Sequence, residues 1–154
     1  MDYILDIIIE RIDLEKIGLK EKKYEWGGEV FSCNPVQYSS DSNIIFEEIE
    51  NYQSYISLDN MEMFQNAIAL CLKSDILYDF EYTINNNSNE LIHNSLFCFL
   101  KELSKLKSAL VLLFREDEEI KEYHEIKSDE DFYLVITNSL KWDNPKDILL
   151  YVKR

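Results

Sequence analysis

The chain has 154 residues, of which 46% are hydrophobic and 13% aromatic, with only 3 Gly and 2 Pro. This balance supplies enough apolar surface to offset the entropy of the unfolded chain, so it excludes intrinsic disorder and predicts one globular domain over residues 1–154. Its 30 acidic and 16 basic side chains give a formal charge of −14, which disfavours direct binding to nucleic acid or to an anionic membrane and favours a basic partner.

Residues 3–17 are predicted to form an amphipathic helix. Their apolar side chains recur at helical spacing and are followed by Gly18, which can end a helix. A strand is the competing interpretation of the same residues. The next segment, 23–33, has aromatic and apolar residues on both sides of Gly27-Gly28, which predicts a β-hairpin with a glycine turn.

Two helices with an acidic outer face are expected next. Ser42 or Asn43 can cap the first, whose inward face carries Ile45, Ile49, Tyr52 and Ile56. Asp59 can cap the second, with Phe64, Ala67, Ile68, Cys71 and Leu72 facing inward. Together these segments predict an αα-hairpin.

From residue 75 to residue 84 the pattern changes to period two. Tyr78, Phe80, Tyr82 and Ile84 alternate with polar residues, which predicts a strand with one face in water. The clearest helical stripe then covers residues 90–106, where Ser88 or Asn89 can act as the N-cap.

The C-terminal third contains short apolar runs, which predict central strands at 109–114 and 132–137. The charged segment 116–131 between them is predicted to be a helix or an exposed crossover, and it is open whether it forms a second binding face. Residues 147–153 favour a closing strand. This order of elements predicts an α+β fold with a small, mainly antiparallel sheet packed by about four helices.

No motif for catalysis or for cofactor binding is found. The only glycines are Gly18, Gly27 and Gly28, and none lies in a phosphate-binding loop. Neither His93 nor His124 lies in an HExxH motif, and residues 116–131 have no glycine for an EF-hand loop. The sequence therefore predicts a protein without cofactor or metal that is not an enzyme, although a catalytic site without a recognisable motif is a third, weaker hypothesis.

A cytoplasmic location is expected. Asp6 and Glu10 interrupt the N-terminal apolar residues, so an export signal is not indicated. The longest apolar run is much shorter than the roughly 18 residues of a membrane span. Cys33, Cys71 and Cys98 lack CxxC spacing and have apolar neighbours, which is typical of buried thiols in a reducing compartment.

The negative charge is unevenly distributed along the chain. Residues 41–90 contain ten acidic and one basic side chain, so they carry nine of the fourteen net negative charges. Tyrosines accompany these carboxylates, and tyrosines provide rigid contact area while carboxylates pair with Lys and Arg. The predicted partner-binding residues are Asp41, Glu47, Glu48, Glu50, Tyr52, Tyr55, Asp59, Glu62, Asp75, Asp79 and Glu81.

These features predict an immunity or antitoxin protein. It would inhibit a basic, nuclease-type toxin by placing carboxylates where nucleic-acid phosphates bind. In size, acidity and lack of catalytic motifs the chain resembles the small acidic immunity proteins of bacterial toxin systems, without a shared motif. Two alternatives are an adaptor domain and a DNA mimic without a dedicated toxin partner, and acidity that serves solubility alone is equally compatible with the composition.

Overall fold

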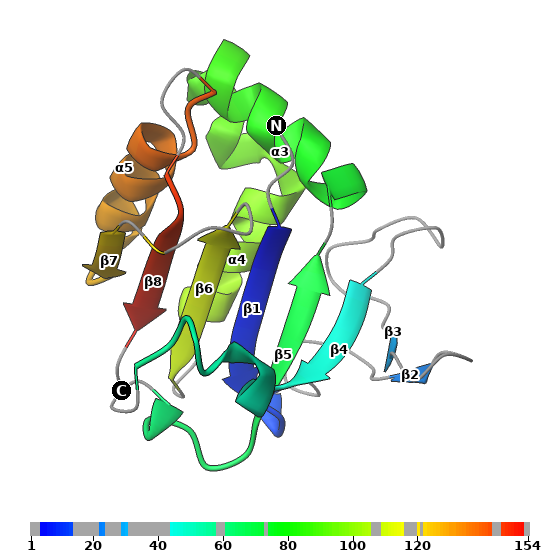
Figure 1. Ribbon diagram of the computed structural model, residues 1–154. Helices are drawn as coiled ribbons and strands as arrows, with labels where there is room; N and C mark the ends of the chain where they lie inside the picture. The colour runs from blue at the N-terminus through cyan, green and yellow to red at the C-terminus, as the bar shows by residue number, and fades with distance from the viewer. Residues whose placement is uncertain are drawn as a thin grey trace.

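The computed structural model describes residues 4–13, 22–23, 29–30, 44–57, 61–72, 74–105, 109–115, 120, 122–142 and 146–152. Six strands in these ranges form the main sheet: β1 (Ile4–Glu10), β4 (Ile44–Glu48), β5 (Ala67–Leu72), β6 (Leu110–Arg115), β7 (Glu122–Glu125) and β8 (Ile148–Val152). Their order across the sheet is β4-β5-β1-β6-β8-β7 (Figure 1). All neighbouring strands are antiparallel except β7 and β8, which are parallel. The predicted α+β class with a mainly antiparallel sheet is therefore confirmed.

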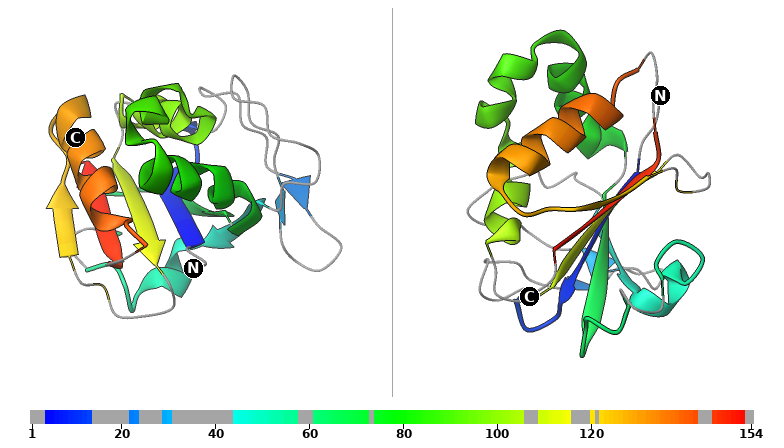
Figure 2. Two further views of the ribbon diagram at one scale, coloured as in Figure 1. Left: turned by 90° about the horizontal axis from the view of Figure 1, so that it is seen from above. Right: turned by 90° about the vertical axis from the view of Figure 1, so that its left-hand side faces the viewer.

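The helices of the described residues cover one face of this sheet. They are α3 (Ser74–Asn86), α4 (Ser95–Ser104) and α5 (Asp129–Ser139), with the 3₁₀ turn η2 (Ser88–His93) between α3 and α4. Figure 2 shows these helices on one side of the sheet and a second 3₁₀ turn, η1 (Ile49–Tyr52), on the other. We call residues 49–57 and 61–66 the cover segment. The helices bury one face of the sheet and the cover segment buries the other, so an apolar cluster forms on each face.

The predicted helix is wrong over residues 4–10, which form the central strand β1 as the competing interpretation has it; residues 3 and 14–17 of that prediction lie outside the described residues. Leu5 pairs with Leu72 of β5 on one side and with Phe114 of β6 on the other. Every residue from 5 to 10 is buried, because helices pack on one face of β1 and the cover segment packs on the other. Because both faces of β1 are buried, its apolar residues do not alternate with exposed ones, so the pattern does not distinguish a strand from a helix.

The predicted αα-hairpin over residues 43–72 is also wrong. Residues 44–48 form the edge strand β4, and residues 67–72 form β5, which pairs with β4 on one side and β1 on the other. All six residues of β5 are buried. Small side chains at Ala67, Ala69 and Cys71 allow the cover segment to approach one face, while the larger residues between them pack under the helices.

Two predicted strands are helices in the structure. Residues 74–86 form α3, which buries Leu77, Phe80 and Ile84 at the three- and four-residue spacing of a helix face. The segment predicted as a strand at 132–137 lies within α5. The Ser128 hydroxyl caps that helix by accepting a hydrogen bond from the Asp131 amide at 3.1 Å.

Other predictions agree with the structure. The strands expected at 109–114 and 147–153 are β6 and β8, and β2 (Lys22–Lys23) pairs antiparallel with β3 (Glu29–Val30) as the hairpin prediction requires. The helix expected over 90–106 is present, but it is divided into η2 and α4. Asn94 lies at the division and caps α4, because its side-chain oxygen accepts a hydrogen bond from the Phe97 amide at 3.0 Å. The charged segment expected as a helix or crossover contributes the strand β7.

Candidate partner-binding surface

The structure does not bring the predicted binding residues together on one surface. Glu50, Tyr52, Tyr55 and Glu62 belong to the cover segment, whereas Asp79 and Glu81 belong to α3 on the opposite face of the sheet. Glu47 and Glu48 lie on the edge strand β4, and Asp75 lies in the first turn of α3. The structure does not describe the side chains of these three residues. Asp41 and Asp59 lie outside the described residues. The predicted single acidic surface is therefore divided between two faces.

Two of the predicted residues are inside the protein. The side chain of Glu81 is only 5% exposed, and that of Tyr52 is 2% exposed. The Tyr52 hydroxyl donates a hydrogen bond of 2.9 Å to Oδ1 of Asp6, which is completely buried in β1. Tyr52 therefore stabilises the fold from inside, and neither residue is available to contact a partner.

Asp6 is the centre of a buried polar network beneath the cover segment. The Arg115 Nε donates a hydrogen bond of 2.9 Å to Asp6 Oδ2, and the Arg115 guanidinium lies 4.9 Å from the centroid of the Tyr55 ring. Burial raises the pKa of Asp6, and it outweighs the opposing effects of Arg115 and of the hydrogen bonds from Arg115, Tyr52 and Cys71. Burial lowers the pKa of Arg115, but the charge of Asp6, the hydrogen bond to Asp6 and the nearby Tyr55 and Tyr52 together outweigh burial and leave that pKa above its ordinary value.

A second buried carboxylate holds the other end of the cover segment. Glu10 accepts hydrogen bonds from the backbone amides of Gln65 at 2.6 Å and Asn66 at 3.0 Å. The Arg11 amide in turn donates to the Asn66 carbonyl at 2.9 Å. Because Asp6 and Glu10 are four residues apart on one strand, they point to the same face of the sheet. The cover segment is thus attached to β1 at two points.

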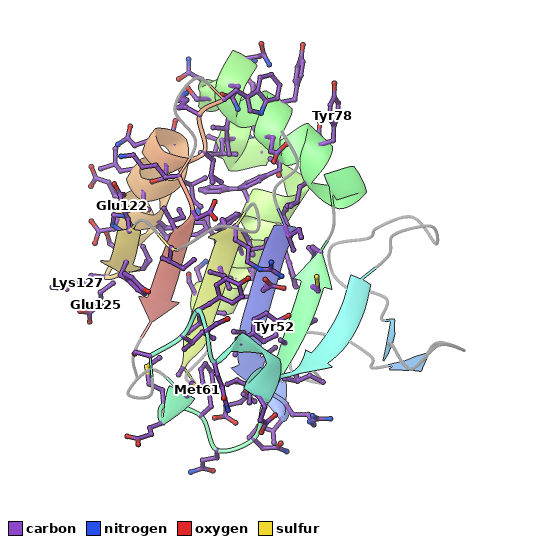
Figure 3. The ribbon with its side chains drawn as sticks, viewed as in Figure 1. Tyr52, Met61, Tyr78, Glu122, Glu125 and Lys127 are labelled. Atoms are coloured by element: carbon purple, nitrogen blue, oxygen red, sulfur yellow. The ribbon has the colours of Figure 1, made fainter. Side chains whose placement is uncertain are left out.

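The exposed side of α3 has a different character. Tyr78 is 64% exposed and Tyr82 is 48% exposed, and their ring centroids are 6.3 Å apart with the planes tilted by 31°. Asp79 is exposed beside them, and its Oδ2 accepts a hydrogen bond of 2.9 Å from the Asn94 amide group. Asn86 continues the same helix face into solvent. We call these four residues the α3 surface; Figure 3 shows Tyr78 pointing away from the sheet.

The tyrosines of the α3 surface were missed because residues 75–84 were predicted as a strand. In that prediction Tyr78 and Tyr82 share the buried face with Phe80 and Ile84. In a helix they are instead four residues apart on the side opposite Phe80 and Ile84, and therefore in solvent. The spacing of Leu77, Phe80 and Ile84 is the signal that could have identified the helix.

The helix that carries the α3 surface is acidic in sequence, and Lys141 donates a hydrogen bond of 3.0 Å to the Ile84 carbonyl near its C-terminal end. The sequence of α3 contains three acidic residues and no basic one. On the neighbouring α4, Lys101 and Lys105 are paired with carboxylates, at 3.7 Å to Asp129 and 3.3 Å to Glu102. These lysines are therefore partly neutralised and do not offset the charge of α3.

Glu122 on β7 is engaged within the protein. Glu122 binds Lys146 and His124, each at 2.8 Å. The hydrogen bond from Lys146, with a second from His124, lowers the pKa of Glu122. Tyr123 and Glu125 on the same strand remain exposed, so they offer side chains for comparison with the α3 surface.

The cysteine prediction is correct for Cys71, which is buried, and wrong for Cys98, which is exposed on α4; Cys33 lies outside the described residues. The Cys98 thiol donates a hydrogen bond of 3.2 Å to the Ile92 carbonyl. Within the described ranges, no group of three or more His, Cys, Asp or Glu side chains is arranged to hold a metal ion. No helix in those ranges is both long enough and apolar enough to cross a bilayer.

Comparison with known proteins gives no relative: no family model matches the chain, and no curated protein or solved structure is significantly similar to it.

Proposed function

We propose that this chain is an inhibitory binding protein of the immunity or antitoxin kind, which acts by binding and not by catalysis. Its partner is a basic, nuclease-type toxin whose nucleic-acid-binding surface it covers. The observation that carries the proposal is the α3 surface, where two exposed tyrosines lie side by side next to Asp79 on a helix without basic residues.

The chemistry of the α3 surface suits such a partner. Tyrosines supply large contact area with few rotatable bonds, and they are enriched among residues that dominate protein interfaces. Carboxylates form charge-assisted hydrogen bonds with the Arg and Lys side chains that otherwise hold phosphates. The formal charge of −14 accelerates the encounter with a cationic surface at low salt.

The test is capture of the partner from source cells with purified protein. The Tyr78→Ala/Tyr82→Ala double variant is compared with Tyr123→Ala, which removes a tyrosine of similar exposure from the edge strand β7. We expect the wild type and Tyr123→Ala to retain one basic protein in equimolar amount. The double variant is expected to bind it at least about thirtyfold more weakly, the effect of losing one strong interface anchor.

Charge is tested separately with Asp79→Asn and its control Glu125→Gln, which each remove one exposed carboxylate. Only Asp79→Asn should weaken binding. The captured protein should cleave nucleic acid when freed from the complex and be inactive within it. Retention of many basic proteins that are released by about 0.3 M salt would instead indicate a DNA mimic, and capture of no basic protein would refute the proposal.

A further inference from the structure

A second candidate binding site lies on the cover-segment face, away from the α3 surface. It is a pocket of about 230 Å³ between η1 and the segment that leads into β5. Ile49, Met61 and Phe64 form its apolar walls, and Ala67 at the start of β5 closes it from below. Figure 3 shows where Met61 lies at this end of the molecule.

The walls of the pocket are fixed in place by the fold. Gln65 and Asn66 line it, and their backbone amides are held by the buried carboxylate of Glu10. The Phe64 amide donates to the Met61 carbonyl at 3.2 Å, which closes a tight turn between the two apolar walls. A pocket held in this way exists before a ligand arrives, so binding needs little rearrangement.

The polar lining favours a cation. Glu50 is exposed and is the acidic residue of the lining, and Gln65 and Asn66, which also line the pocket, carry side-chain amides with an oxygen that can accept hydrogen bonds. No basic side chain is among its lining residues.

We propose that this pocket receives an arginine side chain from a partner protein. The volume is below the roughly 300–1,000 Å³ of sites for small-molecule ligands, but it accommodates one side chain. The planar guanidinium can bind both oxygens of the Glu50 carboxylate, and its aliphatic stem can pack against Ile49 and Met61. Phe64 supplies an aromatic wall, on which guanidinium groups stack better than ammonium groups.

This site is independent of the function proposed for the α3 surface, because the two lie on opposite faces of the sheet. The test uses a small probe, Nα-acetyl-arginine methylamide, and its uncharged citrulline counterpart of nearly the same shape. Binding is followed by the NMR signals of the methionine methyl groups. Met61 and Met63 both pack against the apolar cluster beneath the cover segment, but only Met61 lines the pocket, so Met63 serves as an internal control.

We expect the arginine probe to shift the Met61 signal saturably, with a dissociation constant in the millimolar range, about what a single side chain provides. The citrulline probe should bind at least about threefold more weakly. Glu50→Gln should weaken arginine binding about threefold to fivefold, the scale of one exposed ion pair. The matched control Glu62→Gln removes an exposed carboxylate of the same segment outside the pocket and should change binding less than about 1.5-fold.

Three outcomes would overturn the proposal. The first is that no saturable Met61 shift occurs up to about 50 mM probe, well above a millimolar dissociation constant. The second is that citrulline and arginine probes bind equally, which would remove the role of charge. The third is equal weakening by Glu50→Gln and Glu62→Gln, which would reduce the effect to the general negative charge of the surface. Failure of partner capture through the α3 surface would leave all three readouts unaffected.

Discussion

Replacing Arg115 by methionine tests the buried network beneath the cover segment. The substitution keeps an apolar stem but removes the cation that lies 2.9 Å from the completely buried Asp6. Removing one partner of a buried ion pair costs about 3–5 kcal/mol, because the remaining charge is left without compensation. For a domain of this size the expected fall in Tm is about 2–4 °C for each kcal/mol, or roughly 6–20 °C in all.

The stability lost in the Arg115→Met variant should depend on pH in a defined direction. Burial already raises the pKa of Asp6, and the loss of Arg115 raises it further. A carboxyl whose pKa is raised by folding stabilises the folded state at low pH, and that contribution is lost as pH rises through the folded-state pKa. The destabilisation caused by Arg115→Met should therefore be greatest near pH 8 and shrink toward pH 5, by at most about 1.4 kcal/mol per pH unit.

The assay is urea unfolding followed by circular dichroism at several pH values. The Asp6→Asn/Arg115→Met double variant should recover part of the stability and lose the added pH dependence, since the Asp6 carboxylate is no longer present. Lys105→Met is the control, because its ion pair with Glu102 is exposed on both sides and should contribute no more than about 1 kcal/mol. A loss below about 1 kcal/mol for Arg115→Met, or one that is the same at pH 5 and pH 8, would refute this account of the network.

Three further measurements test other parts of the structure. Phe80→Ala should destabilise the protein by about 3–5 kcal/mol in the same unfolding assay, since Phe80 is buried and stacks on Phe114; a cost below about 1 kcal/mol would contradict its burial in α3. The pKa of Glu122, followed by carboxyl NMR, should lie below that of an ordinary glutamate and rise in Lys146→Met, and an unchanged midpoint would contradict the contact. Iodoacetamide should modify Cys98 well before Cys71 in the native protein, as judged by peptide mass spectrometry; equal rates would contradict their different exposure.

The parts of the fold that sequence predicts well are those with one buried and one exposed face. In α4 the buried residues Leu96, Phe99, Leu100 and Leu103 recur at helical spacing, and Glu102 and Lys105 lie on the exposed side, so the period is that of a helix. The strands β1 and β5 lack this contrast because both of their faces are covered. The tertiary environment decides between helix and strand in such runs, and the sequence of the run itself does not contain that information.

The candidate site was predicted less well than the fold class, for a related reason. The sequence shows directly that acidic residues are concentrated in residues 41–90. Which face of a helix or strand each one occupies depends on the secondary structure predicted for it. Glu81 is predicted on the solvent-exposed face of a strand but is buried in a helix. Tyr78 and Tyr82 are predicted as core residues but are exposed. Tyr52 was a candidate for contact and instead donates its hydroxyl to Asp6, a buried partner 46 positions away that spacing cannot reveal.

The central place of β1 affects how the chain must be assembled during synthesis. β1 pairs along one edge with β6, a much later strand, so that Asp6 lies opposite Leu113. Contacts between residues so distant in sequence slow folding, and this pair cannot form until β6 has been made. Until then the isoleucine-rich segment of β1 can pair with strands other than its native neighbours. Within this segment Asp6 and Glu10, which anchor the cover segment in the finished protein, also supply the charges that oppose aggregation of the nascent chain.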